Sequence, residues 1–152
     1  MSNIIIVYAS LTGNTEEMAE LIAEGIRGTG AAVDLKMVED CNAIRLLEYD
    51  ACLLGAYTWG DGELPDEFAD FVDEMKELNL AGFRAAAFGS GDTSYRLYCA
   101  AVDELEQRLR ENGAVIVQPP LKVEYGPSPE EKVLCREFGA NFAQRIGALN
   151  QP

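Results

Sequence analysis

Three polar stretches hold the residues of this chain best suited to chemistry, and the first begins near the amino terminus. It consists of Ser10, Leu11, Thr12, Gly13, Asn14 and Thr15. An apolar run over 4–9 precedes it and predicts a buried strand, while apolar residues at helical spacing over 18–26 predict a helix after it. Such a junction directs free backbone N–H groups and the positive end of the helix dipole at one point. The stretch is therefore a candidate anion site, and a phosphate is the usual ligand.

The residue types of this stretch restrict the kind of phosphate site it can form. Hydroxyls donate to phosphate oxygens, and Gly13 lets the backbone approach closely. The stretch lacks the lysine of the G-x-x-x-x-G-K-[ST] loop and the repeated glycines of G-x-G-x-x-G, so neutral donors alone would hold the phosphate. A purely structural role is also open, in which Asn14 caps the helix and Glu17 closes a capping box.

The other two stretches each bring an aromatic ring. The second contains Tyr57, Thr58, Trp59, Gly60, Asp61 and Gly62, and the third contains Ser90, Gly91, Asp92, Tyr95, Tyr98 and Cys99. Trp59 is the only tryptophan of the chain, and a polar, glycine-rich turn is a poor place to bury its ring. Trp59 and Tyr95 can sandwich a flat ring, and such stacking contributes on the order of 1 kcal/mol per face.

Two residues of the third stretch admit structural roles as well. Asp92 can accept a hydrogen bond from a ring N–H, or it can cap the helix that begins near Ser94 or Tyr95. Cys99 can be a small buried hydrophobe. The backbone N–H groups of this stretch can donate to ring carbonyls, so the sequence leaves a ligand role and a structural role open for both side chains.

Alternating strands and helices position these stretches. Strands are predicted over 4–9, 33–38, 51–57, 83–89 and 114–118, the last interrupted by Pro119-Pro120 and resuming at Leu121 and Val123. Repeated β-α units predict a parallel sheet with helices on both faces. In such sheets ligands bind beyond the carboxyl ends of the strands, where the strand order switches. Because the three stretches leave those ends, we expect them to converge.

Helical periodicity predicts which residues face the core. The first helix is expected to bury Met18, Leu21, Ile22, Gly25 and Ile26 and to stop at Gly28-Thr29-Gly30. A short helix over 43–49 places Ile44 and Leu47 on successive turns. A helix from Pro65 or Asp66 carries Phe68, Phe71, Val72, Met75 and Leu78, and the next carries Tyr98, Val102, Leu105 and Leu109 before Gly113 stops it. A capping box over 128–131 opens the last helix, with Leu134, Phe138, Phe142 and Ile146 inward.

Composition limits the class of protein. The 152 residues predict one domain over 1–152, which at this size can bury about two-thirds of its unfolded surface. The formal net charge of -14 predicts repulsion of nucleic acid and of anionic membranes, and attraction of a cationic patch on a protein partner. A surplus of acidic residues also simply keeps a protein soluble.

The metal-binding and acid–base repertoire is narrow. The chain has no histidine and no C-x-x-C, so no metal site is expected from its scattered cysteines, which fit a reducing cytosol. The missing histidine also removes the usual general base near neutral pH. No apolar run approaches the roughly 18 residues of a membrane span, and no positive n-region of a signal peptide precedes the first strand.

The three stretches together resemble the flavodoxin family. Ile6-Val7-Tyr8-x-Ser10-x-x-Gly13-x-Thr15, followed by Ala19 and Ile22, matches the phosphate loop of flavodoxins. The segments 55–65 and 89–99 resemble their second and third flavin loops, and the likeness extends over about residues 3–147. Because the fifth strand carries no long insertion, the chain is similar to the short-chain group, particularly to Bacillus-type flavodoxins.

This resemblance implies a doubly wound α/β fold with a five-stranded parallel sheet of order 2-1-3-4-5, and non-covalently bound FMN. By position, the first stretch would hold the phosphate, Trp59 and Tyr95 would flank the isoalloxazine, and Asp92 and Cys99 would lie near its pyrimidine edge. In the family, the peptide after the first aromatic turns over on reduction and its carbonyl accepts from flavin N5–H. That peptide maps to Gly60-Asp61, where glycine suits the change of backbone conformation.

The resemblance also implies an electron-transfer protein rather than an enzyme. It would be a cytoplasmic monomer that cycles between semiquinone and hydroquinone and serves redox proteins with cationic docking patches. A phosphate held without a cation puts negative potential around the ring, and neighbouring acids add to it: Asp61, Glu63, Asp66, Glu67 and Asp92. The second reduction step is therefore predicted at low potential. Arg96 follows Tyr95, where many relatives have an acidic residue, and could soften that potential.

Three other classes fit the sequence less well. An FMN-dependent NAD(P)H:quinone-type reductase of related fold usually has longer loops, and this chain has neither spare length nor a motif for a second substrate. A receiver-type phosphoacceptor domain requires an acidic pair after the first strand and an aspartate ending the third, where this chain has Ser10-Leu11 and Ala56-Tyr57. An interaction module without flavin would leave both loop aromatics without a role.

Overall fold

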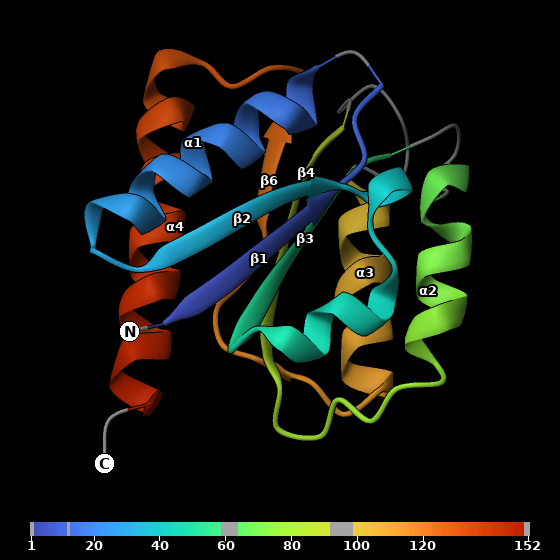
Figure 1. Ribbon diagram of the computed structural model, residues 1–152. Coiled ribbons are helices and arrows are strands. Elements are labelled where there is room, and N and C mark those ends of the chain that lie inside the picture. The colour runs from blue at the N-terminus through green and yellow to red at the C-terminus, as the bar shows by residue number, and fades with distance from the viewer. Residues whose placement is uncertain (1, 12, 59–63, 92–98, 151–152) are drawn as a thin grey trace.

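The computed structural model describes residues 2–11, 13–58, 64–91 and 99–150, and their centre is a parallel sheet (Figure 1). Within these residues its strands are β1 Asn3–Tyr8, β2 Ala32–Met37, β3 Ala51–Tyr57, β4 Arg84–Gly91, β5 Val115–Ile116 and β6 Leu121–Glu124. The order is β2-β1-β3-β4-β5, with β6 also paired to β4. The predicted order is therefore confirmed.

The fifth position of the sheet is divided between two short strands. β5 pairs with Arg84 and Ala85 at the beginning of β4, and β6 pairs with the segment from Phe88 to Gly91 at its end. Pro119-Pro120 lies between them, and the ladder is interrupted there because proline has no N–H to donate. At the predicted interruption the chain therefore stops pairing with the beginning of β4 and resumes pairing with its end. This brings β6 to the carboxyl edge of the sheet.

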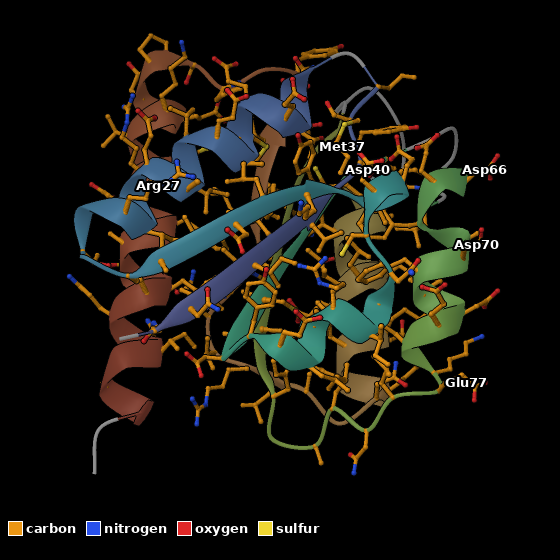
Figure 2. The ribbon with its side chains drawn as sticks, viewed as in Figure 1. Arg27, Met37, Asp40, Asp66, Asp70 and Glu77 are labelled. Carbon is orange, nitrogen blue, oxygen red and sulfur yellow. The ribbon has the colours of Figure 1, made fainter. Side chains whose placement is uncertain are left out.

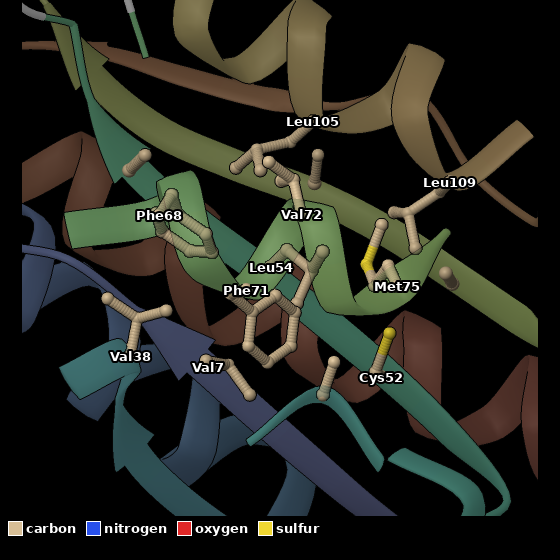
Figure 3. Packing of buried hydrophobic residues seen from close by; sticks show 14 of the residues in the cluster. Val7, Val38, Cys52, Leu54, Phe68, Phe71, Val72, Met75, Leu105 and Leu109 are labelled. Carbon is tan, nitrogen blue, oxygen red and sulfur yellow. The ribbon is translucent and has the colours of Figure 1, made fainter. Parts of the chain in front are cut away.

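Helices cover both faces of the sheet, as the alternating pattern predicts. α1 (Asn14–Gly28) and α4 (Pro129–Asn150) lie on one face, and α2 (Ala69–Met75) and α3 (Ala100–Glu111) lie on the other (Figure 1). Alternate residues of β1 supply the two cores: Ile4 and Ile6 pack toward α1 and α4, and Ile5 and Val7 toward the opposite side. Figure 3 shows the second core, in which side chains of α2 and α3 meet those of the central strands.

Three short 3-10 helices complete the described elements, namely η1 Val38–Asp40, η2 Ala43–Glu48 and η3 Asp66–Phe68. The helix predicted from Pro65 or Asp66 begins as η3 and continues as α2. In η2, Ala43 and Leu46 are buried, whereas Ile44 and Leu47 are 61% and 53% exposed. A 3-10 helix has about three residues per turn, so each of these pairs shares a face and only one pair can face the core.

One expectation for α4 is wrong. Leu134 is 48% exposed, and Cys135 takes the buried position beside Phe138, Phe142 and Ile146. Neighbouring residues on a helix differ by about 100° in direction, so burial of Cys135 turns Leu134 away from the core. The remaining stripe of α4 is inward as predicted, and so are the stripes of α1 and α2.

α1 and α4 approach each other closely through two glycines. A Cβ at Gly25 of α1 would collide with the backbone of Arg136, and one at Gly139 of α4 would collide with the backbone of Ile22. The sequence pattern placed Gly25 on the buried face, and the structure supplies the reason. Close contact between the two helices fixes the direction of α1, and the first turn of α1 begins within the first polar stretch.

Candidate cofactor site

The three polar stretches leave the carboxyl ends of β1, β3 and β4. From β1 the chain first adds β2 on one side of β1 and then β3 on the other. The connections after β1 and β3 therefore leave the sheet in opposite directions, and the gap between them is where open α/β sheets bind ligands. The topology thus selects this edge for a ligand before any side chain is considered.

Ser10 gathers two backbone donors of the first stretch. Its Oγ accepts the N–H of Gly13 at 3.1 Å and the N–H of Glu16 at 3.2 Å. Gly13 has a left-handed φ of 89°, which favours glycine, and it immediately precedes α1. Within 10–15 no residue is basic, so the available donors are hydroxyls, one amide and backbone N–H groups. N–H groups that converge on one oxygen at a helix N-terminus also suit an oxygen of a phosphate.

The alternative in which Asn14 caps α1 is wrong. Asn14 is the first residue of the helix, Gly13 holds the cap position, and no side-chain hydrogen bond forms at that cap. The backbone N–H of Glu17 donates to Gly13 O at 2.9 Å, and one of its carboxylate oxygens lies 3.5 Å from Lys132 Nζ. Because the cap residue itself offers no side chain, the first-turn N–H groups that Ser10 does not accept are left for a ligand.

Ser90 connects all three stretches. Its Oγ lies 2.8 Å from Thr15 Oγ1, and its backbone oxygen accepts the N–H of Thr58 at 3.1 Å. Thr15 and Ser90 are 1% and 4% exposed, so this contact is shielded from water. The expected convergence is confirmed for the described residues, since one buried serine of β4 touches the loops that follow β1 and β3.

Thr58 also fixes the helix that follows the third stretch. Its Oγ1 accepts the N–H of Ala101 at 3.2 Å, in the first turn of α3. Sequence reasoning placed Thr58 in the site but missed this contact, because the two residues are far apart in the chain. A threonine at the end of a strand shows no local pattern that would identify a cap for a distant helix.

The end of the third stretch packs against β6. Cys99 is fully buried, has a φ of 52°, and directs its Sγ at Val123 O at 3.9 Å. Gly91 O accepts the N–H of Tyr125 at 2.9 Å, and Tyr125 is also left-handed with a φ of 56°. The structural alternative for Cys99, a small buried hydrophobe, agrees with this burial. Sequence reasoning did not include the segment after β6 in this edge.

Two tyrosines at this edge donate to carboxylates. Tyr8 OH lies 3.2 Å from Glu16 Oε2, and burial, followed by Glu16, raises the pKa of Tyr8 to about 12. Tyr57 OH lies 2.8 Å from Glu67 Oε2, and burial, followed by the hydrogen bond to Glu67, raises the pKa of Tyr57. Both phenols are neutral donors near neutral pH, so neither compensates the negative charge of its partner.

The remaining residues of the predicted site divide into two groups. Leu11 is 61% exposed, and Asn14, Tyr57, Thr58 and Gly91 are partly buried. The others lie outside the described residues: Thr12, Trp59, Gly60, Asp61, Gly62, Asp92, Tyr95 and Tyr98. The expectations for the ring-flanking aromatics and for Gly60-Asp61 therefore remain predictions.

A doubly wound sheet with a polar, cation-free loop at its switch point defines a class of ligand-binding α/β protein, and comparisons with known proteins identify the family. The flavodoxin family model matches residues 6–139. Probable flavodoxin 2 of Bacillus subtilis is 45% identical over 148 residues, which are 97% of this chain and 98% of the relative. The flavodoxin of Maridesulfovibrio salexigens is 38% identical over 149 residues, covering 96% and 100%.

Solved structures agree with the sequence relatives. The crystal structure of oxidised flavodoxin 1 from Bacillus cereus superposes with a TM-score of 0.91 at 46% identity, covering 94% of this chain and 98% of that one. The chain belongs to the flavodoxin family. The resemblance to short-chain, Bacillus-type flavodoxins is confirmed.

Family membership sets the chemistry. Flavodoxins bind FMN and carry electrons, so this chain is an FMN-binding electron-transfer protein rather than an enzyme, and its partners are redox proteins. Flavodoxins are a standard example of ligand binding at the switch between β1 and β3. The quinone reductase alternative is not favoured. In the described parts of the chain, no helix is long and apolar enough to cross a membrane, and no cluster of potential metal ligands occurs.

Proposed function

We propose that the three polar stretches form a single FMN site, and that FMN bound there makes the protein a low-potential one-electron carrier. Ser90 is the observation that supports this most directly. Its hydroxyl contacts Thr15 of the first stretch, and its carbonyl accepts from Thr58 of the second. A ligand spanning these stretches needs such a common anchor, because a rigid site keeps its groups in register.

The residues assigned to FMN are those expected from the sequence. The phosphate is assigned to Ser10, Leu11, Thr12, Gly13, Asn14 and Thr15, and the flavin ring to Tyr57, Thr58, Trp59, Gly60, Asp61, Gly62, Ser90, Gly91, Asp92, Tyr95, Tyr98 and Cys99. The donors that converge on Ser10 fit a phosphate, because hydroxyls and N–H groups hold it without a cation. Bound FMN supplies the one-electron chemistry, and the chain holds and orients it.

The carboxyl edge of the sheet carries negative potential. Glu16, Glu20 and Glu39 contribute to the raised pKa of Tyr8, and Glu39, Asp66 and Glu67 contribute to that of Tyr57. Carboxylates thus act on the ends of both β1 and β3. Their negative charge opposes the addition of a further electron to a flavin bound there. About 1.4 kcal/mol of electrostatic destabilisation of the reduced form lowers a one-electron potential by about 60 mV.

The same charge supports a cationic docking patch on the redox partners. Figure 2 shows Asp66, Asp70 and Glu77 along the α2 side of the molecule, with Asp40 near the Asp66 end. All four residues are exposed. Opposite charge accelerates encounters in a salt-dependent way, and such contacts are small and short-lived. The proposal further includes a monomer formed by one domain over 1–152, acting in the cytoplasm without nucleic acid or membrane.

An anaerobic redox titration of the FMN-loaded protein, followed by visible absorbance, tests this proposal. We expect two separate one-electron steps, the second at a lower potential than in free FMN. Protein that gains no flavin spectrum after addition of FMN would overturn the site. Reduction in a single two-electron step would overturn the carrier role.

A charge variant sharpens this titration. Neutralising Asp66 and Glu67 together, as Asp66→Asn and Glu67→Gln, should raise the second potential by tens of millivolts, on the order of the 60 mV that correspond to ~1.4 kcal/mol. The matched control neutralises two acids toward the other end of α2, as Glu74→Gln and Glu77→Gln. Equal shifts in both variants would show that net charge, rather than charge at this edge, sets the potential.

A further inference from the structure

The buried contact between Ser90 and Thr15 joins two hydroxyls whose positions are 75 residues apart in the sequence. We propose that Ser90 is a positioning residue that orients the Thr15 hydroxyl toward the phosphate and thereby makes the site select FMN over flavin without a phosphate. This inference rests on the proposed FMN site. It assigns a role to Ser90 through Thr15 rather than through direct contact with the phosphate.

The number of hydroxyl hydrogens available indicates which of Ser90 and Thr15 donates in this hydrogen bond. At an Oγ to Oγ1 distance of 2.8 Å either hydroxyl can donate, and the bond uses one of the two hydrogens. Thr15 lies in the first turn of α1, beside the anion loop, whereas Ser90 lies within β4. An anion in the loop attracts the Thr15 hydrogen. Ser90 is then the donor to Thr15, and Thr15 is the donor to the phosphate.

Burial makes this chain of hydrogen bonds effective. Because Thr15 and Ser90 are 1% and 4% exposed, water does not readily replace either partner. A hydroxyl that accepts one hydrogen bond becomes a stronger donor in the next. Without the Ser90 hydroxyl, Thr15 loses both the donor of the hydrogen bond that it accepts and its fixed orientation, and the cost falls on the contact with a charged ligand.

The other contact of Ser90 allows a clean substitution. Thr58 donates to the Ser90 backbone oxygen, which a side-chain change leaves in place. Ser90→Ala therefore removes the contact with Thr15 while keeping the main chain of Ser90, which carries both the link to the second stretch and the contact expected with the flavin ring. Riboflavin lacks the phosphate, so its affinity reports the ring-binding loops, and the ratio of the two affinities reports the phosphate site alone.

Flavin fluorescence titrations of the apoprotein with FMN and with riboflavin test this inference. We expect Ser90→Ala to raise the Kd for FMN about tenfold and that for riboflavin less than about twofold. Ser90→Cys, which keeps a small side chain and a weak donor, should give an intermediate ratio. In a Thr15→Val background, Ser90→Ala should leave the ratio unchanged, because Ser90 acts through Thr15.

A remote hydroxyl provides the control. Thr29 Oγ1 donates to Ile26 O at 2.7 Å at the other end of α1, and Thr29→Ala should change neither Kd. The inference is overturned if Ser90→Ala weakens both flavins equally, or if it lowers FMN affinity as much without the Thr15 hydroxyl. A wild-type protein that does not prefer FMN to riboflavin would instead overturn the proposed site, so the two failures are distinguishable.

Discussion

The N-termini of α1 and α4 solve the same chemical problem in different ways. In α4, Ser128 Oγ accepts the N–H of Glu131 at 3.2 Å, and Glu131 Oε1 accepts the N–H of Ser128 at 3.0 Å. This reciprocal capping box satisfies the helix end from within. In α1, Gly13 has no side chain to offer, and Ser10 of the preceding loop collects the N–H groups of Gly13 and Glu16.

The first-turn carboxylates show the same contrast. Glu131 of α4 closes the end of its own helix, whereas Glu16 of α1 accepts from Tyr8 at the end of β1. A helix end that its own carboxylate closes has little use for an added anion. A helix end whose carboxylate is engaged elsewhere keeps its positive dipole available. The comparison shows why α1, and not α4, begins at the proposed phosphate site.

The largest expected effect comes from giving α1 an anion of its own. Ser10→Asp places a carboxylate where the N–H groups of Gly13 and Glu16 converge. It should raise the Kd for FMN by about a hundredfold, because two like charges a few ångströms apart repel by several kcal/mol at the effective dielectric of a protein surface. Fluorescence titration measures the loss.

Ser10→Asn is the matched control for this change, because it has nearly the same shape without the charge. The factor by which Ser10→Asn raises the Kd for FMN should be less than a tenth of the factor for Ser10→Asp. Both variants should unfold at similar urea concentrations. Equal losses in the two variants would show that shape, and not an anion in the loop, decides binding.

A smaller effect is expected when the closed helix end is opened. Ser128→Ala removes the hydroxyl that accepts from Glu131 and should lower the free energy of unfolding by about 1 kcal/mol. The Kd for FMN should stay unchanged, because this cap serves the helix alone. Urea unfolding and FMN titration of the same variant separate the two effects. A clear loss of FMN affinity would contradict the division of roles between the two helix ends.

The last effect appears only at high pH and concerns the contact between Tyr8 and Glu16, which holds Glu16 away from its own helix. Because the pKa of Tyr8 is raised from 10.0 to about 12, the stabilising contribution of its neutral hydroxyl is complete below pH 10 and disappears as the pH rises to about 12. Stability should therefore fall over this range, and less steeply in Tyr8→Phe. Urea midpoints at about pH 9 and about pH 11 measure the difference. An equal fall of the urea midpoint between these two pH values in wild type and in Tyr8→Phe would contradict the assignment to Tyr8.

Local patterns predicted most of the framework. Each described strand was expected from an apolar or alternating run, and the prolines at 119–120 indicated where the fifth would divide. The capping box at Ser128 and Glu131 formed as its spacing indicates. Periodicity failed where a short helix left two faces with similar composition. In η2 the apolar pair Ile44 and Leu47 faces solvent, whereas Ala43 and Leu46 lie in the core.

Some features of the proposed site follow from the sequence, and others follow only from the tertiary structure. The sequence by itself determined the family, the polar stretches and the absence of a cation from the first of them, because those depend on residue type and spacing. Only the tertiary structure decided that Ser10 rather than Asn14 serves the start of α1, and that Ser90 joins Thr15 to Thr58. These contacts join loops and strands that meet only after the sheet forms, and no local periodicity encodes a hydrogen bond between residues 75 positions apart.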